Sequence, residues 1–155
     1  MQIRRATADD ADTLAALNAH VQDIHVRHHP AHFRPPVLAD VADWFRARLV
    51  EPGIQAWLVA VAGQPVAYAL VIPRERPANP FTVAERSCEI DQLGVLPEAR
   101  RQGIARALIA HIRSEARRAG ITTVVLNTWM FNAEARAAFE RLGFEPELLR
   151  YRLGE

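Results

Sequence analysis

The sequence predicts a mixed α/β fold. Apolar residues recur at helical spacing over the first 50 positions and again over 104–116, whereas 56–72 and 86–95 are rich in β-forming residues. The chain has 155 residues, of which 50% are hydrophobic and 24% are charged, a composition typical of a globular protein with an ordinary core. We therefore expect one domain over residues 1–155.

The N-terminal third predicts a short strand followed by two helices. Residues 2–5 suit a strand, and Thr7 with Asp10 three residues later has the pattern of a capping box, which predicts a helix over 8–26. A loop is expected at 31–38. The apolar spacing from Val41 to Leu49 then predicts a second helix that ends near 52–53.

The rest of the chain alternates strands and helices. Two β-rich runs flank Gly63 and Gln64, a pattern that predicts an antiparallel hairpin over 56–72. Gly120 and Gly143 are placed to end two helices. The remaining expected elements are a loop at 74–82, a strand at 86–95, a helix from 104, a strand at 122–127, a helix at 133–141 and a strand at 148–153.

Composition excludes several classes of protein. The formal net charge is +1 and aromatic-plus-basic RNA motifs are missing, so we expect no nucleic-acid partner. One cysteine cannot form an internal disulfide, the N-terminus is too charged for a signal peptide, and no apolar run approaches the roughly 20 residues that span a bilayer. We expect a cytoplasmic protein that binds no membrane.

The stretch VLPEARRQGIARALIAHI, residues 95–112, passes from a strand into a helix through a group of arginines. The first N–H groups of a helix lack partners within it, and the helix dipole favours an anion there. Gly103 and Ala105 keep the backbone accessible, and Arg100, Arg101 and Arg106 add positive charge. The stretch predicts a pyrophosphate site. The alternative is a solvated arginine-rich turn.

The pattern Val95-x-Pro97-x-x-Arg100-x-x-Gly103-x-Ala105 resembles the signature of the GNAT superfamily of N-acetyltransferases. The segment NAEARAAFERLGF, which begins at Asn132, is similar to the second cofactor-contacting region of that family. The N-terminal IRRATADDADTLAAL resembles its first strand and capped helix. Together these similarities span nearly the whole chain.

The resemblance implies a twisted, mostly antiparallel sheet of about six to seven strands flanked by about four helices, with strands 4 and 5 parallel and splayed. Acetyl-CoA would lie between those two strands, with Gly94 as a bulge residue that opens the gap. No metal is implied, and the histidines between positions 20 and 32 lack the partners of a metal set. The implied cofactor-binding residues are Leu93, Gly94, Val95, Arg100, Arg101, Gln102, Gly103, Ile104, Ala105, Arg106, Asn132, Ala135 and Phe139.

The implied reaction is direct acetyl transfer to a primary amine of a small molecule or a peptide. An alkyl amine has a pKa near 10, so a base is needed, and Glu89 falls where relatives carry a catalytic glutamate, with Asp91 as the second candidate. The backbone N–H of Leu93 would stabilise the oxyanion. Many relatives carry a tyrosine acid where this chain has Phe139. A catalytically silent acyl-CoA-binding sensor or interaction module is therefore the alternative.

The acceptor is not specified by these motifs. The family places it among residues 20–50 and the loop at 74–84, and Arg27, Arg34, Arg74 and Arg76 in those segments favour an acceptor with an acidic group. Edge strands of such a sheet would also allow a homodimer.

Overall fold

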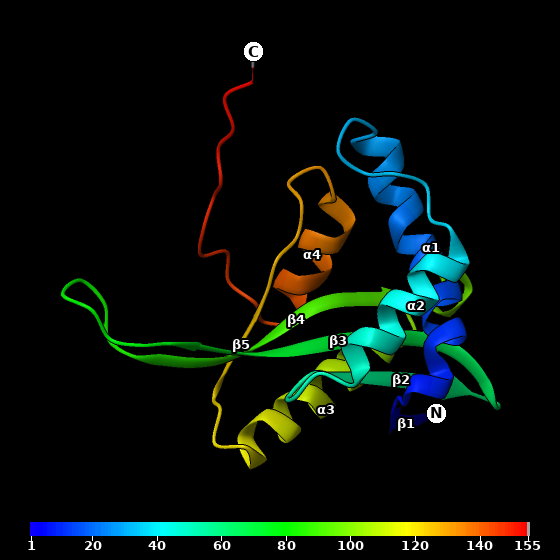
Figure 1. Cartoon of the computed structure of the whole chain (residues 1–155), viewed down its shortest axis with the longest axis horizontal. Coiled ribbons are helices and arrows are strands. Elements are labelled where there is room, and N and C mark those ends of the chain that lie inside the picture. The colour runs from blue at the N-terminus through cyan, green and yellow to red at the C-terminus, as the bar shows by residue number, and fades with distance from the viewer. Residues whose placement is uncertain (155) are drawn as a thin grey trace.

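The computed structural model describes residues 1–154 and contains one sheet with helices on both faces (Figure 1). Its strands lie in the order β1-β2-β3-β4-β5. The elements are β1 (Gln2–Arg5), a 3-10 turn (Ala8–Asp10), α1 (Ala11–His28), α2 (Leu38–Leu49), β2 (Gln55–Val61), β3 (Gln64–Arg76), β4 (Glu85–Val95), a 3-10 turn (Pro97–Ala99), α3 (Ile104–Arg118), β5 (Thr123–Leu126) and α4 (Ala133–Arg141).

The sheet confirms the predicted topology. Strands β1 to β4 pair antiparallel with their neighbours, and β5 pairs parallel with β4 through Ser87 to Ile90 only. The last five residues of β4 therefore have β3 on one side and, among the described strands, no neighbour on the other. This is the splayed pair that the family resemblance implies.

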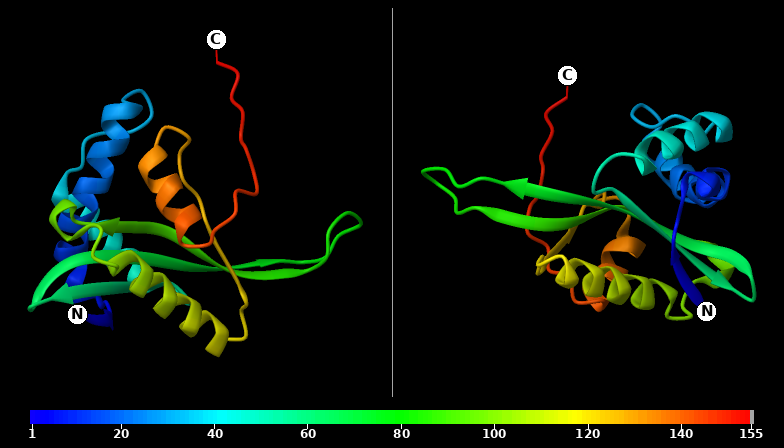
Figure 2. Two further views of the ribbon diagram at one scale, coloured as in Figure 1. Left: turned by 180° about the vertical axis from the view of Figure 1, so that it is seen from behind. Right: turned by 60° about the horizontal axis from the view of Figure 1, so that its bottom comes forward.

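Two apolar cores lie on opposite faces of the sheet. Helices α1 and α2 cover one face, where Leu14, Phe45 and Tyr68 are fully buried. Helix α3 covers the other face, where Leu108 and Ile112 pack on the sheet and the end of α4 adds Leu142 and Phe144 (Figure 2). None of the helices within residues 1–154 combines the length and apolar composition needed to cross a membrane.

Local signals placed most element boundaries correctly. The capping box forms, and the N–H of Thr7 donates to the Asp10 carboxylate over 2.8 Å. Gly120 and Gly143 adopt φ values of +74° and +93° just beyond α3 and α4, as the predicted helix ends require. The hairpin strands β3 and β4 run further than predicted, which shortens the expected loop at 74–82 to residues 77–84.

The strand expected at 148–153 is wrong for this chain, and the sheet has five strands rather than six to seven. Residues 145–154 have no secondary structure and run away from the sheet after α4 (Figures 1 and 2). A strand needs a neighbour for its backbone groups, and this segment has none within the described part of the chain. Its apolar side chains are consequently exposed, Leu153 completely.

Candidate active site

The turn between β4 and α3 exposes the start of α3. Arg101 and Gly103 have φ values of +60° and +79°, a left-handed conformation that turns the chain sharply into the helix. No side chain of residues 1–154 caps α3. Nothing lies within 4 Å of a Cβ built on Gly103, so the glycine is needed for its φ angle and leaves the helix end accessible. The positive end of the α3 dipole therefore faces open space.

The backbone of Leu93 and Val95 faces the gap between β4 and β5. The N–H of Leu96 donates to Val66 of β3 over 2.9 Å, so alternate residues 95 and 93 direct their backbone groups to the other edge. One of these groups is already used, because Nε of Arg100 donates to the Val95 carbonyl over 3.2 Å. These backbone groups could pair with an extended ligand.

Arg100 also connects the gap to α4. Its guanidinium lies 3.6 Å from the carboxylate of Glu134 in the first turn of α4. Asn132 caps that helix by accepting a hydrogen bond from the N–H of Ala135 over 3.2 Å. Further along α4, Phe139 packs edge-to-face on Phe144. Because this residue is a phenylalanine, it offers no hydroxyl at the position where relatives carry a tyrosine.

The face of β4 toward α1 and α2 carries the polar side chains. Glu89 accepts hydrogen bonds from Arg74 of β3 and from the amide of Asn127, which follows β5. Gln92 accepts from Asn18 of α1 and from the hydroxyl of the buried Tyr68, at 3.1 and 3.0 Å. Glu89 therefore lies on the face of β4 where the acceptor is expected, and Arg74 holds it there, whereas Asp91 has no salt bridge among the described residues.

Asp91 occupies a bulge. Leu70 pairs with Gln92 and Val71 with Ile90, which leaves Asp91 as the extra residue of β4. The expectation that Gly94 is the bulge residue is therefore wrong, because Gly94 pairs regularly with Tyr68 and makes room for its ring. The Asp91 residue keeps a solvent-exposed surface, but partial burial of its carboxyl raises its pKa, and the charge of Glu89 adds to this effect.

A cavity of about 280 Å³ reaches β4 at Gln92. Gln92 of β4, the residue after Asp91, contributes to its lining together with α1, α2 and the loop between them. Trp44 and Phe45 form its aromatic part, and Arg34 and Asp40 carry its charges. The cavity therefore lies on the predicted acceptor side and could receive a molecule with both an apolar and a charged part.

An aromatic cluster that the sequence did not reveal joins α1 to the segment between β5 and α4. His25 stacks on Phe33 with 4.7 Å between ring centroids, and His28 stacks on Phe131 at 4.9 Å. Trp129 contacts Phe33 edge-to-face. Burial lowers the pKa of His25, which favours its neutral form. Among residues 1–154 no group of three or more potential metal ligands is close together.

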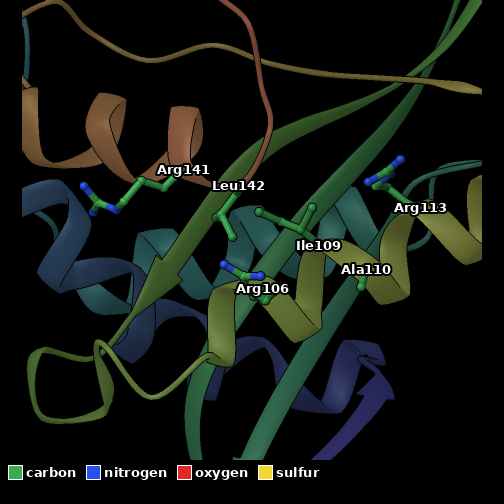
Figure 3. A pocket seen from close by; sticks show the side chains of 6 residues that line it. All are labelled: Arg106, Ile109, Ala110, Arg113, Arg141 and Leu142. Atoms are coloured by element: carbon green, nitrogen blue, oxygen red, sulfur yellow. The ribbon is translucent and has the colours of Figure 1, made fainter.

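Arginines line a second cavity, of about 180 Å³, between α3 and the end of α4 (Figure 3). Arg106 lies below the end of α4, with Arg141 to one side of it and Arg113 to the other, and Ile109 and Leu142 provide apolar contacts. The cavity lies next to the open start of α3, because Arg106 belongs to the first turn of that helix.

Three features thus lie together, as the family resemblance implies: a gap between parallel strands, an open helix start at its mouth and carboxylates on the same strand. The chain belongs to the acetyltransferase (GNAT) family, whose sequence model matches residues 18–144. It is 30% identical over 106 residues to N-acetyltransferase 8 of Homo sapiens, covering 68% of this chain and 45% of that protein.

A second relative is the [ribosomal protein bS18]-alanine N-acetyltransferase of Escherichia coli, 38% identical over 58 residues, which is 37% of this chain and 39% of that protein. The chain thus spans only about half the length of the curated relatives it matches.

Solved structures share the fold. A variant of the BH1408 protein from Bacillus halodurans superposes with a TM-score of 0.92 at 23% identity, covering 100% of this chain and 99% of that one. The aminoglycoside N-acetyltransferase AAC(6')-Iy, solved in complex with CoA, has a TM-score of 0.70 at 18% identity and covers 99% of both chains.

Proposed function

We propose that residues 1–155 form one acetyltransferase domain that transfers the acetyl group of acetyl-CoA to a primary amine of a small molecule or a protein. The observation that carries the proposal is the geometry of β4. Its last residues border an open gap that leads to the uncapped start of α3, and its middle residues carry two carboxylates close in sequence to Gln92, which lines the cavity against α1 and α2. A single strand thus joins a donor site to an acceptor site.

In this proposal the N–H groups of Arg101 through Arg106 bind the pyrophosphate, and the backbone of Leu93, Gly94 and Val95 pairs with the pantetheine arm. Asn132, Ala135 and Phe139 line the other side of the arm from α4. Arg100 must release the Val95 carbonyl as the arm enters and can then pair with a phosphate oxygen. The arginine-lined cavity beside Arg106 takes the 3′-phosphate of CoA.

We propose Asp91 as the general base. Glu89 accepts hydrogen bonds from both Arg74 and Asn127, so its oxygens are less available to an incoming amine. Partial burial raises the pKa of Asp91, and the charge of Glu89 adds to this effect, which favours proton acceptance by Asp91. The sequence favoured Glu89 as the base and Asp91 as the second candidate. The proposal reverses that order because the two hydrogen-bond donors to Glu89, Arg74 and Asn127, come from distant segments and could not be foreseen.

The amine nitrogen attacks the thioester carbonyl carbon, and its proton passes to Asp91. The oxyanion accepts a hydrogen bond from the Leu93 N–H, the C–S bond then breaks, and CoA leaves as a thiolate. A thiol has a pKa near 8.5, so water can protonate the leaving group without a tyrosine at Phe139. Acetylated amine and CoA are the products.

The acceptor binds in the cavity next to Gln92. Relatives are named for acting on a ribosomal-protein alanine and on aminoglycosides, so both protein and small-molecule amines occur as acceptors in the family. Arg74 and Arg76 are paired with Glu89 and Glu85, which leaves Arg34 as the arginine that lines this cavity. The acidic-acceptor hypothesis therefore depends on Arg34. It predicts that Arg34→Gln removes any preference for acidic acceptors.

Release of CoA thiol over a panel of amines and N-terminal peptides tests the function, with acetyl-CoA binding followed in parallel by calorimetry. Asp91→Asn should reduce kcat about 100-fold or more while acetyl-CoA still binds. Glu89→Gln should retain more activity and shift the acidic limb of the pH–rate profile to lower pH, since it removes a charge that raises the pKa of Asp91.

Glu140→Gln, on the exposed side of α4, is the matched control and should behave as wild type. Loss of activity in Glu89→Gln alone would assign the base to Glu89. Binding of acetyl-CoA without turnover of any amine would favour the silent sensor, and no binding of acetyl-CoA would refute the proposal as a whole.

A further inference from the structure

Side chains from α1, β3 and β4 form a hydrogen-bonded group, here called the amide triad: Asn18, Tyr68 and Gln92. Nδ2 of Asn18 donates to the Tyr68 hydroxyl over 2.9 Å and to Oε1 of Gln92 over 3.1 Å. The Tyr68 hydroxyl donates to the same oxygen of Gln92 over 3.0 Å. Tyr68 is fully buried, so these bonds satisfy a hydroxyl that water does not reach.

The triad by itself permits two arrangements of its hydrogen atoms. Turning the amides of both Asn18 and Gln92 exchanges each donor for an acceptor, and the Tyr68 hydroxyl suits either pattern because it both donates and accepts. The carboxylate of Asp91 distinguishes the two arrangements. It shares a hydrogen bond with the Gln92 side chain, and an ionised carboxylate only accepts. The Gln92 atom that faces away from the triad is therefore the amide nitrogen, Nε2.

This nitrogen places a hydrogen-bond donor next to the proposed base. It carries two N–H groups, of which Asp91 takes one. Gln92 also lines the cavity of about 280 Å³ whose aromatic part is Trp44 and Phe45. The second N–H is therefore available to a molecule that binds in this cavity and turns its amine toward Asp91.

A base and a donor side by side restrict what the acceptor carries. An oxygen that is separated from the amine nitrogen by two carbon atoms lets one molecule contact both side chains at once. An α-amino acid and the first residue of a peptide both contain this unit, whereas a simple alkyl amine does not. An alkyl amine that displaces water from the cavity would leave the N–H of Gln92 without a partner, which lowers its affinity.

We propose that Gln92 determines acceptor specificity by binding a carbonyl or carboxylate oxygen separated from the reacting amine by two carbon atoms, which makes the acceptor an α-amino acid or the α-amine of a peptide. The inference rests on the acetyl transfer proposed above. Gln92 positions the acceptor and takes no proton itself. Asn18 and Tyr68 act only through the direction in which they hold the Gln92 amide.

A matched set of amines tests the specificity. L-phenylalaninamide and L-phenylalanine carry the oxygen as an amide and as a carboxylate, and phenethylamine has the same ring and amine without it. Release of CoA thiol gives the ratio of kcat/KM for each oxygen-bearing amine to that for phenethylamine. Gln92→Leu should lower the ratio roughly 10-fold for the amide if the acceptor is a peptide and for L-phenylalanine if it is a free amino acid. An unchanged ratio for both would overturn the inference.

Gln92→Glu is the second variant, because it keeps an oxygen for Asn18 and Tyr68 and replaces only the N–H groups. Its ratio should fall as well, which a purely structural role of Gln92 does not predict. Gln64→Leu, exposed at the start of β3, is the matched control and should leave the ratio unchanged. Far-UV circular dichroism checks that each variant is folded.

The pH–rate profile gives a further measurement. Burial and the charge of Glu89 raise the pKa of Asp91, whereas Arg48, Arg74 and the hydrogen bond with Gln92 act in the opposite direction. Gln92→Leu removes only that hydrogen bond, so the acidic limb should move to higher pH. A limb that stays in place together with an unchanged ratio would show that Gln92 serves only to satisfy the core.

The direction of the amide is tested at Asn18. Asn18→Asp replaces a donor with an acceptor, which turns the Gln92 amide so that its oxygen faces the cavity, and the ratio should fall as in Gln92→Leu. Asn18→Ala supplies no acceptor and should keep the ratio, because Asp91 still holds the amide nitrogen. A wild-type ratio in Asn18→Asp would overturn the argument from the triad.

Binding measurements separate this inference from the proposed function. Trp44 lines the cavity, so tryptophan fluorescence reports acceptor binding without turnover. The preferred oxygen-bearing amine should bind wild type roughly 10-fold more tightly than Gln92→Leu, and phenethylamine should bind both equally. If this difference is found but no amine is acetylated, the proposed function fails and the specificity of Gln92 stands. If wild type acetylates amines but both proteins bind every amine equally, the inference about Gln92 fails and acetyl transfer stands.

Discussion

Gly94→Ala should destabilise the protein, although alanine normally suits a strand better than glycine. A Cβ at position 94 would lie 2.7 Å from Cε1 of Tyr68 and 2.9 Å from Cγ2 of Val21, whereas carbon atoms make favourable contact near 3.5–4.0 Å. Tyr68 is fully buried and its hydroxyl is held by Asn18 and Gln92, so its ring cannot withdraw.

The destabilisation caused by this clash should exceed the stabilisation that alanine gives by restricting the unfolded chain. Overpacking of a core costs about 1–3 kcal/mol, and the reduced freedom of the unfolded chain returns about 0.4–1 kcal/mol. We expect Gly94→Ala to lower the free energy of unfolding by about 1–2 kcal/mol, equivalent to roughly 2–8 °C in Tm for a chain of this size. Urea unfolding followed by tryptophan fluorescence measures the difference.

Gly154→Ala is the control, because nothing lies within 4 Å of its Cβ position. Val21→Ala removes one of the two clashing atoms and should restore part of the loss when combined with Gly94→Ala. If Gly94→Ala unfolds at the same urea concentration as wild type, a Cβ fits at position 94 and the reasoning from the close packing of Tyr68 is refuted.

Three further perturbations test other parts of the structure. Tyr68→Phe removes a buried hydroxyl that makes two hydrogen bonds and should cost about 1–2 kcal/mol in urea unfolding, and a negligible difference would contradict that network. Arg141→Gln should weaken CoA binding about 10-fold in calorimetry but leave 3′-dephospho-CoA unaffected, with Arg117→Gln as control; equal weakening of both ligands would exclude the proposed 3′-phosphate site. Asp10, whose pKa is lowered to about 2 chiefly by its hydrogen bond with Arg4, stabilises the fold fully above about pH 4 and progressively less as the pH falls through 2. Asp10→Ala should therefore destabilise the protein at pH 6 and make little difference at pH 2 in urea titrations.

Local signals in the sequence determined the order of elements and the geometry at the start of α3. Apolar periodicity defines each helix and strand from residues a few positions apart, and Thr7, Asn132 and Gly143 mark helix ends through groups within one turn. The open start of α3 is equally local, since it depends on a strand, a sharp turn and Gly103 in sequence. These features could be predicted without any knowledge of tertiary contacts.

Only the tertiary structure decided the surroundings of the two carboxylates of β4. Glu89 meets Arg74 and Asn127, which lie 15 and 38 positions away, and the bulge at Asp91 depends on how β4 pairs with β3. Residues 145–154 do not form the predicted strand for a related reason, because apolar residues in a segment can specify a buried face but not the strand that covers it. Periodicity and capping are local properties of the chain, whereas the partner of a carboxylate or of a strand edge depends on which distant segments folding brings together.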